Sequence, residues 1–106
     1  DRDISVVFGA GGNRDGSKRA RMGAVASKFA NKVYVTNDNP RDEKPEDIIN
    51  EILSGIKDQS KTRAMVDRAF AIQEALRELG EDEVLMILGK GDEDYMEIAK
   101  EKIPFD

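Results

Sequence analysis

The sequence predicts an α/β fold, an open and mostly parallel sheet with helices on both faces and a short C-terminal hairpin. The first observation is that short apolar runs rich in β-branched residues end at glycine or polar turn residues, as strands do. The second is that longer segments with apolar residues at helical spacing separate these runs. Strands that alternate with helices form a parallel sheet, which needs helices on both faces.

Two strands and one helix are predicted in the N-terminal third. The first strand, residues 4–8, leads into the glycine-rich residues 9–12. The helix over residues 18–30 is expected to bury one apolar face, formed by Met22, Val25, Ala26, Phe29 and Ala30. This helix should end near Asn31, because the β-branched and aromatic residues 33–35 begin the second strand.

A second helix is predicted to begin at Pro45. Proline suits the first helical turn, and the acidic Glu46 and Asp47 complement the positive end of the helix dipole. Its apolar stripe consists of Ile48, Ile49, Ile52, Leu53 and Ile56. Further strands are predicted over residues 62–66 and 83–88.

A third helix is predicted between these strands, with Asp67 as its N-cap and Gly80 at its C-cap. Its apolar stripe consists of Ala69, Ile72, Ala75, Leu76 and Leu79. The tail, residues 95–105, is predicted to form a short hairpin that turns near residues 99–100. A helix over residues 95–100 is the alternative.

The composition limits the kinds of function. The 106 residues suffice for one domain with a single modest core, so residues 1–106 are expected to form one domain. Cysteine and histidine are absent, so we predict neither catalytic residues nor a metal site in this chain. Because the sequence has no apolar stretch of about 20 residues and no signal-peptide pattern, we expect a cytoplasmic protein that does not enter membranes.

The charge is acidic overall but basic in one place. A formal net charge of −5 argues against nucleic-acid binding, which needs a basic surface. One short run collects four cations around a single acid, Asp15: Arg14, Lys18, Arg19 and Arg21. Such a run is ordinarily a solvated face, although this one adjoins a glycine-rich loop.

The loop after the second strand, residues 36–41, reads Thr-Asn-Asp-Asn-Pro-Arg. Open α/β sheets bind ligands beyond the carboxyl ends of their strands. Arg41 can hold a carboxylate through two parallel hydrogen bonds, and Asn39 offers both a donor and an acceptor. The loop therefore suits the head group of an amino acid, and an Asx-type turn that caps the next helix is the alternative.

The loop after the first strand fits neither common phosphate-binding motif. Arg14 replaces the third glycine of a dinucleotide fingerprint, and the order Ser17-Lys18 misplaces the lysine of a P-loop. Its backbone amides and neighbouring cations can still meet an anion, and a simple tight turn is the alternative.

The loop after the last long strand, residues 89–95, carries two glycines and three acids. Glu93 can accept hydrogen bonds from an ammonium group, and a solvated acidic surface is the alternative. Since the carboxyl ends of parallel strands meet at one edge, we expect all three loops to converge there. Arg19 and Arg41 with Glu93 would then match the two charges of an amino acid.

Six segments, in the same order along the chain, resemble the C-terminal domain of the Mur ligases. They read VFGAGGNRD (7–15), KR with MG (18–23), VTNDNPR (35–41), DR (67–68), GKG with EDY (89–95) and IPFD (103–106). The resemblance implies a Rossmann-like domain of a three-domain, ATP-dependent ligase. Such a ligase adds the third amino acid to UDP-N-acetylmuramoyl-L-alanyl-D-glutamate in peptidoglycan synthesis. The Asp-Asn-Pro-Arg form of the loop is associated in the family with meso-diaminopimelate.

The resemblance also implies roles for single residues. Those implied to bind substrate are Arg19, Asp38, Asn39, Arg41, Gly89 and Glu93. The two arginines and the asparagine would hold the distal carboxylate of meso-diaminopimelate, which lysine lacks. The glycine carbonyl and the glutamate would hold the distal ammonium, and the aspartate would support the loop or the ligand.

The resemblance places the cofactors elsewhere. ATP and Mg²⁺ would act in the N-terminal and central domains of the same chain, and no cofactor would be bound by this domain alone. Asn13 and Arg14 would approach the nucleotide. Because the chain lacks the P-loop and begins with Asp1 rather than Met, we expect a fragment of a longer, monomeric enzyme that is inactive by itself.

Two residues depart from the family pattern, Asp92 where histidine is usual and Asn13 where aspartate is usual. They leave room for an unusual third amino acid. The alternatives are a ligase that adds lysine or another diamino acid, and a stand-alone module that binds an amino acid or phosphate without reaction.

Overall fold

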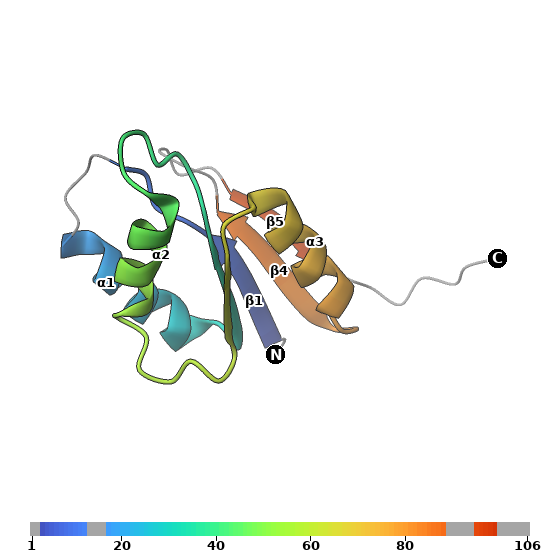
Figure 1. Cartoon of the computed structure of the whole chain (residues 1–106). Coiled ribbons are helices and arrows are strands. Elements are labelled where there is room, and N and C mark those ends of the chain that lie inside the picture. The colour runs from blue at the N-terminus through green and yellow to red at the C-terminus, as the bar shows by residue number, and fades with distance from the viewer. Residues whose placement is uncertain (1–2, 13–16, 89–94, 100–106) are drawn as a thin grey trace.

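The described part of the chain forms one five-stranded sheet with three helices. The computed structural model describes residues 3–12, 17–88 and 95–99 (Figure 1). The elements in chain order are β1 (Asp3–Phe8), α1 (Ser17–Phe29), β2 (Lys32–Thr36), α2 (Pro45–Leu53), β3 (Thr62–Met65), α3 (Arg68–Glu78), β4 (Glu83–Leu88) and β5 (Tyr95–Ala99). The strands lie in the order β3-β2-β1-β4-β5, and the first four are parallel. The predicted α/β fold, open and mostly parallel, is confirmed.

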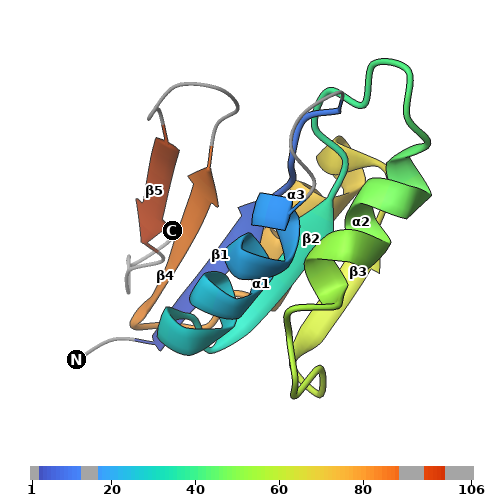
Figure 2. The ribbon, with the colours of Figure 1, turned by 90° about the vertical axis from the view of Figure 1, so that its left-hand side faces the viewer.

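The core has one layer on each face of the sheet, because successive strand residues point to opposite faces. In β1, Val6 and Phe8 belong to the layer under α1 and α2, whereas Val7 belongs to the layer under α3. Val6 and Val7 are completely buried. Figure 2 shows α1 and α2 in front of the sheet and α3 behind it. The prediction of helices on both faces is therefore confirmed.

The tail begins with a strand and not with a helix. Tyr95–Ala99 pairs antiparallel with β4, with Tyr95 opposite Leu88 and Ala99 opposite Val84. The alternative of a helix over residues 95–100 is therefore wrong for this segment, because the edge of β4 offers it a complete set of backbone partners. The predicted turn near residues 99–100 adjoins residues 100–106, which lie outside the described part of the chain.

The inward face of α1 differs from the prediction. Met22, Val25 and Phe29 are 37%, 54% and 42% exposed, whereas Gly23 and Ala26 are buried. The reason is close helix packing, because a Cβ atom on Gly23 would lie 2.1 Å from the Ile52 carbonyl oxygen of α2. Small residues face α2, and the large apolar side chains of α1 are turned outward.

The other helices agree more closely with the sequence. The predicted α2 residues Ile48, Ile49 and Ile52 are buried. In α3 the predicted N-cap is confirmed, since the Asp67 carboxylate accepts a hydrogen bond of 3.1 Å from the Phe70 N–H.

Two details of α3 were predicted wrongly. Of the predicted stripe, Ala75 and Leu79 are buried and Ile72 packs against the core, but Ala69 and Leu76 are exposed. Ala71, which was not predicted, is completely buried. The C-cap of the helix is Leu79 in an extended conformation, and Gly80 instead donates its N–H to the Glu83 carboxylate at 2.7 Å. Because the Glu83 carboxylate accepts the Gly80 N–H, this N–H does not bond back to the last carbonyls of the helix as it would in a left-handed glycine cap.

Candidate functional site

Two of the three predicted loops contact each other at the carboxyl edge of the sheet. The loop after β1 donates the Gly12 N–H to the Asn39 carbonyl at 2.6 Å in the loop after β2. A Cβ atom on Gly12 would lie 1.7 Å from the Pro40 carbonyl oxygen, and one on Gly9 would lie 2.3 Å from the Thr36 carbonyl oxygen. The glycines of the first loop therefore allow its backbone to touch the second loop directly.

Arg41 has the most unusual backbone of the second loop. Its φ angle is 53°, in the left-handed region that non-glycine residues seldom adopt. The residue is exposed, and one terminal nitrogen of its guanidinium donates to the Gly12 carbonyl at 2.8 Å. A strained residue of this kind persists only where surrounding contacts fix it, and such residues cluster at ligand sites.

Asp38 and Asn39 lie beside Arg41 in the same loop. Both are partly exposed. Within the described ranges, neither side chain makes a hydrogen bond. An amide, a carboxylate and a guanidinium are therefore presented together at the carboxyl end of β2, where open α/β sheets bind ligands.

Arg19 lies beneath these loops and is 3% exposed. Its two terminal nitrogens donate to the two oxygens of Glu43, both at 2.9 Å, and one also donates to Glu51 at 2.9 Å. The other also donates to the Gly11 carbonyl at 3.0 Å. The hydrogen bonds that Arg19 donates to Glu43, although opposed by desolvation, hold the pKa of Arg19 above its ordinary value. That Arg19 holds a ligand carboxylate stays a prediction. Within the described part of the chain, its four hydrogen bonds use the two terminal nitrogens, and its buried Nε has no hydrogen-bond partner.

Four predicted site residues lie outside the described part of the chain: Asn13, Arg14, Gly89 and Glu93. The convergence of the third loop with the other two therefore stays a prediction. Among the residues that the structure describes, no group of three or more acidic side chains is placed to hold a metal ion. Within the same residues, no helix has the length and apolar character needed to cross a membrane.

Two polar residues at this edge had no role in the sequence prediction. The Asn37 side-chain oxygen and one terminal nitrogen of Arg68 are buried and have no hydrogen-bond partner among the residues that the structure describes. Another Arg68 nitrogen donates to the Leu88 carbonyl at 3.1 Å, which ties the start of α3 to the end of β4. Both residues fall in segments that carry the family resemblance, and this was the signal available for finding them.

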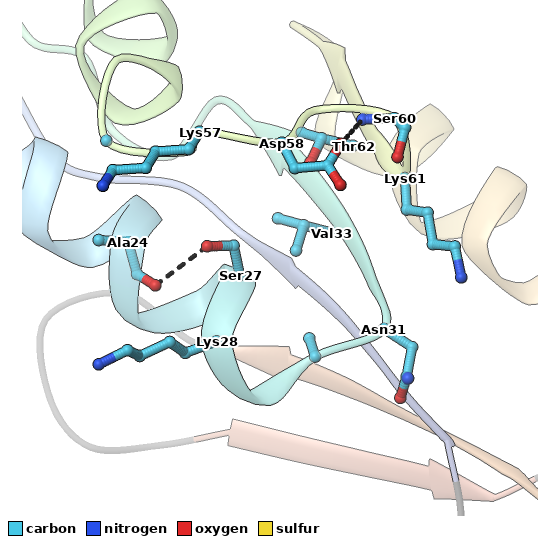
Figure 3. A pocket seen from close by; sticks show the side chains of 12 residues that line it. Ala24, Ser27, Lys28, Asn31, Val33, Lys57, Asp58, Ser60, Lys61 and Thr62 are labelled. Carbon is cyan, nitrogen blue, oxygen red and sulfur yellow. Dashed lines mark hydrogen bonds between the residues drawn. The ribbon is translucent and has the colours of Figure 1, made fainter.

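A separate pocket lies at the amino-terminal end of the sheet, between α1 and the segment after α2 (Figure 3). Its volume is about 750 Å³, and none of the predicted site residues lines it. Lys28 and Lys57 extend to one side of the pocket and Lys61 to the other (Figure 3). Lys28 occupies the last turn of α1, where a cation offsets the negative end of the helix dipole. This pocket therefore gives no reason to move the candidate site.

The fold defines an α/β domain whose candidate ligand site lies at the carboxyl edge of the sheet, where the loops after β1 and β2 meet. Residues 1–91 match the family described as "Mur ligase, glutamate ligase domain". The chain belongs to this family, and the resemblance seen in the motifs is confirmed.

The chain is also similar to longer curated proteins. It is 59% identical over 103 residues to a protein of Helicobacter hepaticus, and this aligned region covers 97% of this chain and 22% of the relative. It is 51% identical over 105 residues to one of Helicobacter pylori, covering 99% and 23%. It is 50% identical over 99 residues to one of Aquifex aeolicus, covering 93% and 20%. All three are named UDP-N-acetylmuramoyl-L-alanyl-D-glutamate--2,6-diaminopimelate ligase. The chain thus spans only about a fifth of their length.

Proposed function

We propose that this chain is the C-terminal, amino-acid-binding domain of a longer ATP-dependent ligase. That ligase adds meso-diaminopimelate to UDP-N-acetylmuramoyl-L-alanyl-D-glutamate in the cytoplasm. The observation that carries the proposal is the similarity over nearly the whole chain to relatives named for this reaction. The exposed, left-handed Arg41 at the carboxyl edge supports it, because open α/β sheets bind ligands at this edge and a guanidinium can hold a carboxylate.

In this proposal the domain positions the nucleophile. Arg41 and Asn39 hold the distal carboxylate of the amino acid, and Asp38 supports the loop or the ligand. The Gly89 carbonyl and Glu93 hold the distal ammonium. The amino group that forms the peptide bond is then held at a fixed place, and such positioning is a large part of catalysis when two substrates must meet.

The cofactors are assigned to the rest of the longer protein. ATP with Mg²⁺ supplies the activation of the D-glutamate carboxylate. The described residues contain no phosphate-binding loop of the P-loop type and no acidic cluster suited to a metal, so the fit to these groups is poor within this chain. We propose that Asn13 and Arg14 approach the nucleotide when the domains close.

The decisive experiment is a ligation assay on the full-length protein with the UDP-muramoyl dipeptide, ATP and Mg²⁺. Meso-diaminopimelate, lysine and lanthionine are compared, with Arg41→Ala and Arg41→Lys as variants. We expect a preference for meso-diaminopimelate and a rise in its KM of about tenfold or more in both variants, since a lysine cannot replace the two-pronged contact. Arg77→Ala is the matched control, because Arg77 is an exposed arginine on α3 whose partners are Glu74 and Glu78.

The other outcomes are informative. If lysine is ligated and Arg41 is dispensable, the family stands but the assignment of the carboxylate contact is wrong. If no amino acid is ligated, the proposal fails and a binding module becomes the better description.

A further inference from the structure

Resting on the function proposed above, we propose that Arg19 is a positioning residue that sets the affinity for the incoming amino acid without touching it. It would act as a buried clamp on the loop that carries Asn39 and Arg41. The juxtaposition that carries this inference is one guanidinium bound to both site loops and to α2 at once.

Arg19 connects the two loops of the candidate site. From α1, its side chain reaches the Gly11 carbonyl in the first loop and Glu43 at the end of the second loop. The contact with Glu43 uses both carboxylate oxygens, each at 2.9 Å, which is the geometry of a planar, two-pronged pair. Such a pair fixes direction as well as distance, so the position of Glu43 is determined by that of Arg19.

Glu43, which Arg19 holds, is close in the chain to the predicted ligand residue Arg41. Glu43 lies two residues after Arg41, and the Glu43 N–H donates to the Pro40 carbonyl at 2.9 Å. Arg19 and Arg41 also donate to the carbonyls of adjacent residues, Gly11 and Gly12. Displacement of Glu43 would therefore be transmitted to the left-handed Arg41 through only a few bonds.

The positive charge of Arg19 is already balanced by carboxylates of the protein. Arg19 carries one positive charge and binds two carboxylates, Glu43 and Glu51, at 2.9 Å each. A ligand carboxylate at the same guanidinium would be the third anion around one cation, which like-charge repulsion opposes. Arg41, in contrast, is an exposed residue of this loop.

The test compares two matched substitutions in the full-length protein. Glu43→Gln weakens the clamp on the loop, while Glu51→Gln removes an equal charge from Arg19 but leaves the loop attached. Positioning predicts that Glu43→Gln raises the KM for meso-diaminopimelate by about tenfold, with the KM values for ATP and the dipeptide unchanged. It predicts less than about a twofold change for Glu51→Gln.

Direct binding by Arg19 predicts the opposite. Either substitution would free the guanidinium, so the KM for the amino acid would fall. A KM that falls or stays constant in Glu43→Gln therefore overturns the inference. Arg19→Lys keeps the charge and loses the two-pronged contact, and in combination with Glu43→Gln it should add no further increase in KM.

A second measurement keeps this inference separate from the proposed function. Hydrogen exchange of the peptide over residues 37–44 should be faster in Glu43→Gln than in Glu51→Gln, with or without activity. Equal exchange in the two variants would contradict the clamp. Failure of the wild-type protein to ligate would contradict only the proposed function.

Discussion

Tyr34 is a single residue that joins the core to a surface charge cluster. It is 2% exposed, and its hydroxyl donates to the Glu78 carboxylate at 2.5 Å. Burial first, and then the bond to Glu78, raises the pKa of Tyr34 above its ordinary value. The bond from Tyr34 and the ion pair with Arg63 together lower the pKa of Glu78, although desolvation opposes them.

A Tyr34→Phe variant should therefore lose stability in a pH-dependent way. We expect a loss of about 1–2 kcal/mol in the free energy of unfolding near neutral pH, because the hydrogen bond to a charged acceptor is removed. A carboxyl group whose pKa is lowered by folding contributes stability above its ordinary value of 4.5, and this contribution disappears as the pH falls through the folded-state pKa. The difference in the free energy of unfolding between the variant and the wild type should therefore be smaller at acidic pH than at neutral pH.

Urea unfolding at about pH 7 and about pH 3.5 measures this difference. An unchanged difference at the two pH values would show that Glu78 does not stabilise the fold through its charge. Thr36→Val is a useful comparison, since Thr36 is also fully buried and donates to the uncharged Val66 carbonyl. Its loss of stability should not depend on the protonation of a carboxylate.

At the scale of elements, the contact between α1 and α2 depends on glycine at both sides. A Cβ atom on Gly55 would lie 1.8 Å from the Ala20 carbonyl oxygen, as one on Gly23 would clash with Ile52. Backbone atoms cannot move aside as the end of a side chain can. The two helices are therefore held at a spacing that excludes even a methyl group.

Gly23→Ala should lower the free energy of unfolding by about 1–3 kcal/mol through overpacking. The higher helix propensity of alanine should offset up to about 1 kcal/mol of this loss. Gly80→Ala is the control, since its Cβ atom would meet only the flexible Glu83 carboxylate at 3.2 Å. We expect a change within about 0.5 kcal/mol for the control. Thermal and urea unfolding measure both, and equal stabilities would refute tight packing of α1 on α2.

The sequence predicted the elements better than their orientation. Apolar runs located all four parallel strands, and Pro45 and Asp67 located the starts of α2 and α3. On the predicted inward face of α1, Ala26 and Ala30 do pack in the core, but Met22, Val25 and Phe29 are exposed. Periodicity identifies the largest apolar side chains and not the small ones that let helices touch. Tertiary packing decided the orientation here.

The candidate site was also predictable only in part. The position of Asn39 and Arg41 at the carboxyl end of β2 follows from the order of strand and loop. That Arg19 is bound by Glu43 and Glu51 depends on side chains 24 and 32 residues away, and no local pattern contains this information.

At the scale of the whole molecule, the sheet separates two regions with different character. The loops after β1 and β2 form the candidate site at one end of the strands, while the pocket of Figure 3 lies at the other end. In the proposed function, the residues of the candidate site bind and orient an amino acid. Activation of the second substrate would take place in other parts of the longer protein.

The 106-residue chain alone should therefore not catalyse ligation. With the UDP-muramoyl dipeptide, ATP, Mg²⁺ and meso-diaminopimelate, we expect neither tripeptide product nor release of ADP. Circular dichroism and a cooperative thermal transition should accompany the assay, so that the absence of turnover is measured on folded protein. Turnover by the isolated chain would contradict the division of roles proposed here.

The direct contact between the loops after β1 and β2 also bears on how this family changes over evolutionary time. Gly12 lies against Pro40 with no space for a single added carbon atom. An insertion or deletion in one loop would move backbone into backbone unless the other loop changed length with it. The two segments, almost thirty residues apart in the sequence, are thus expected to gain and lose residues as a pair.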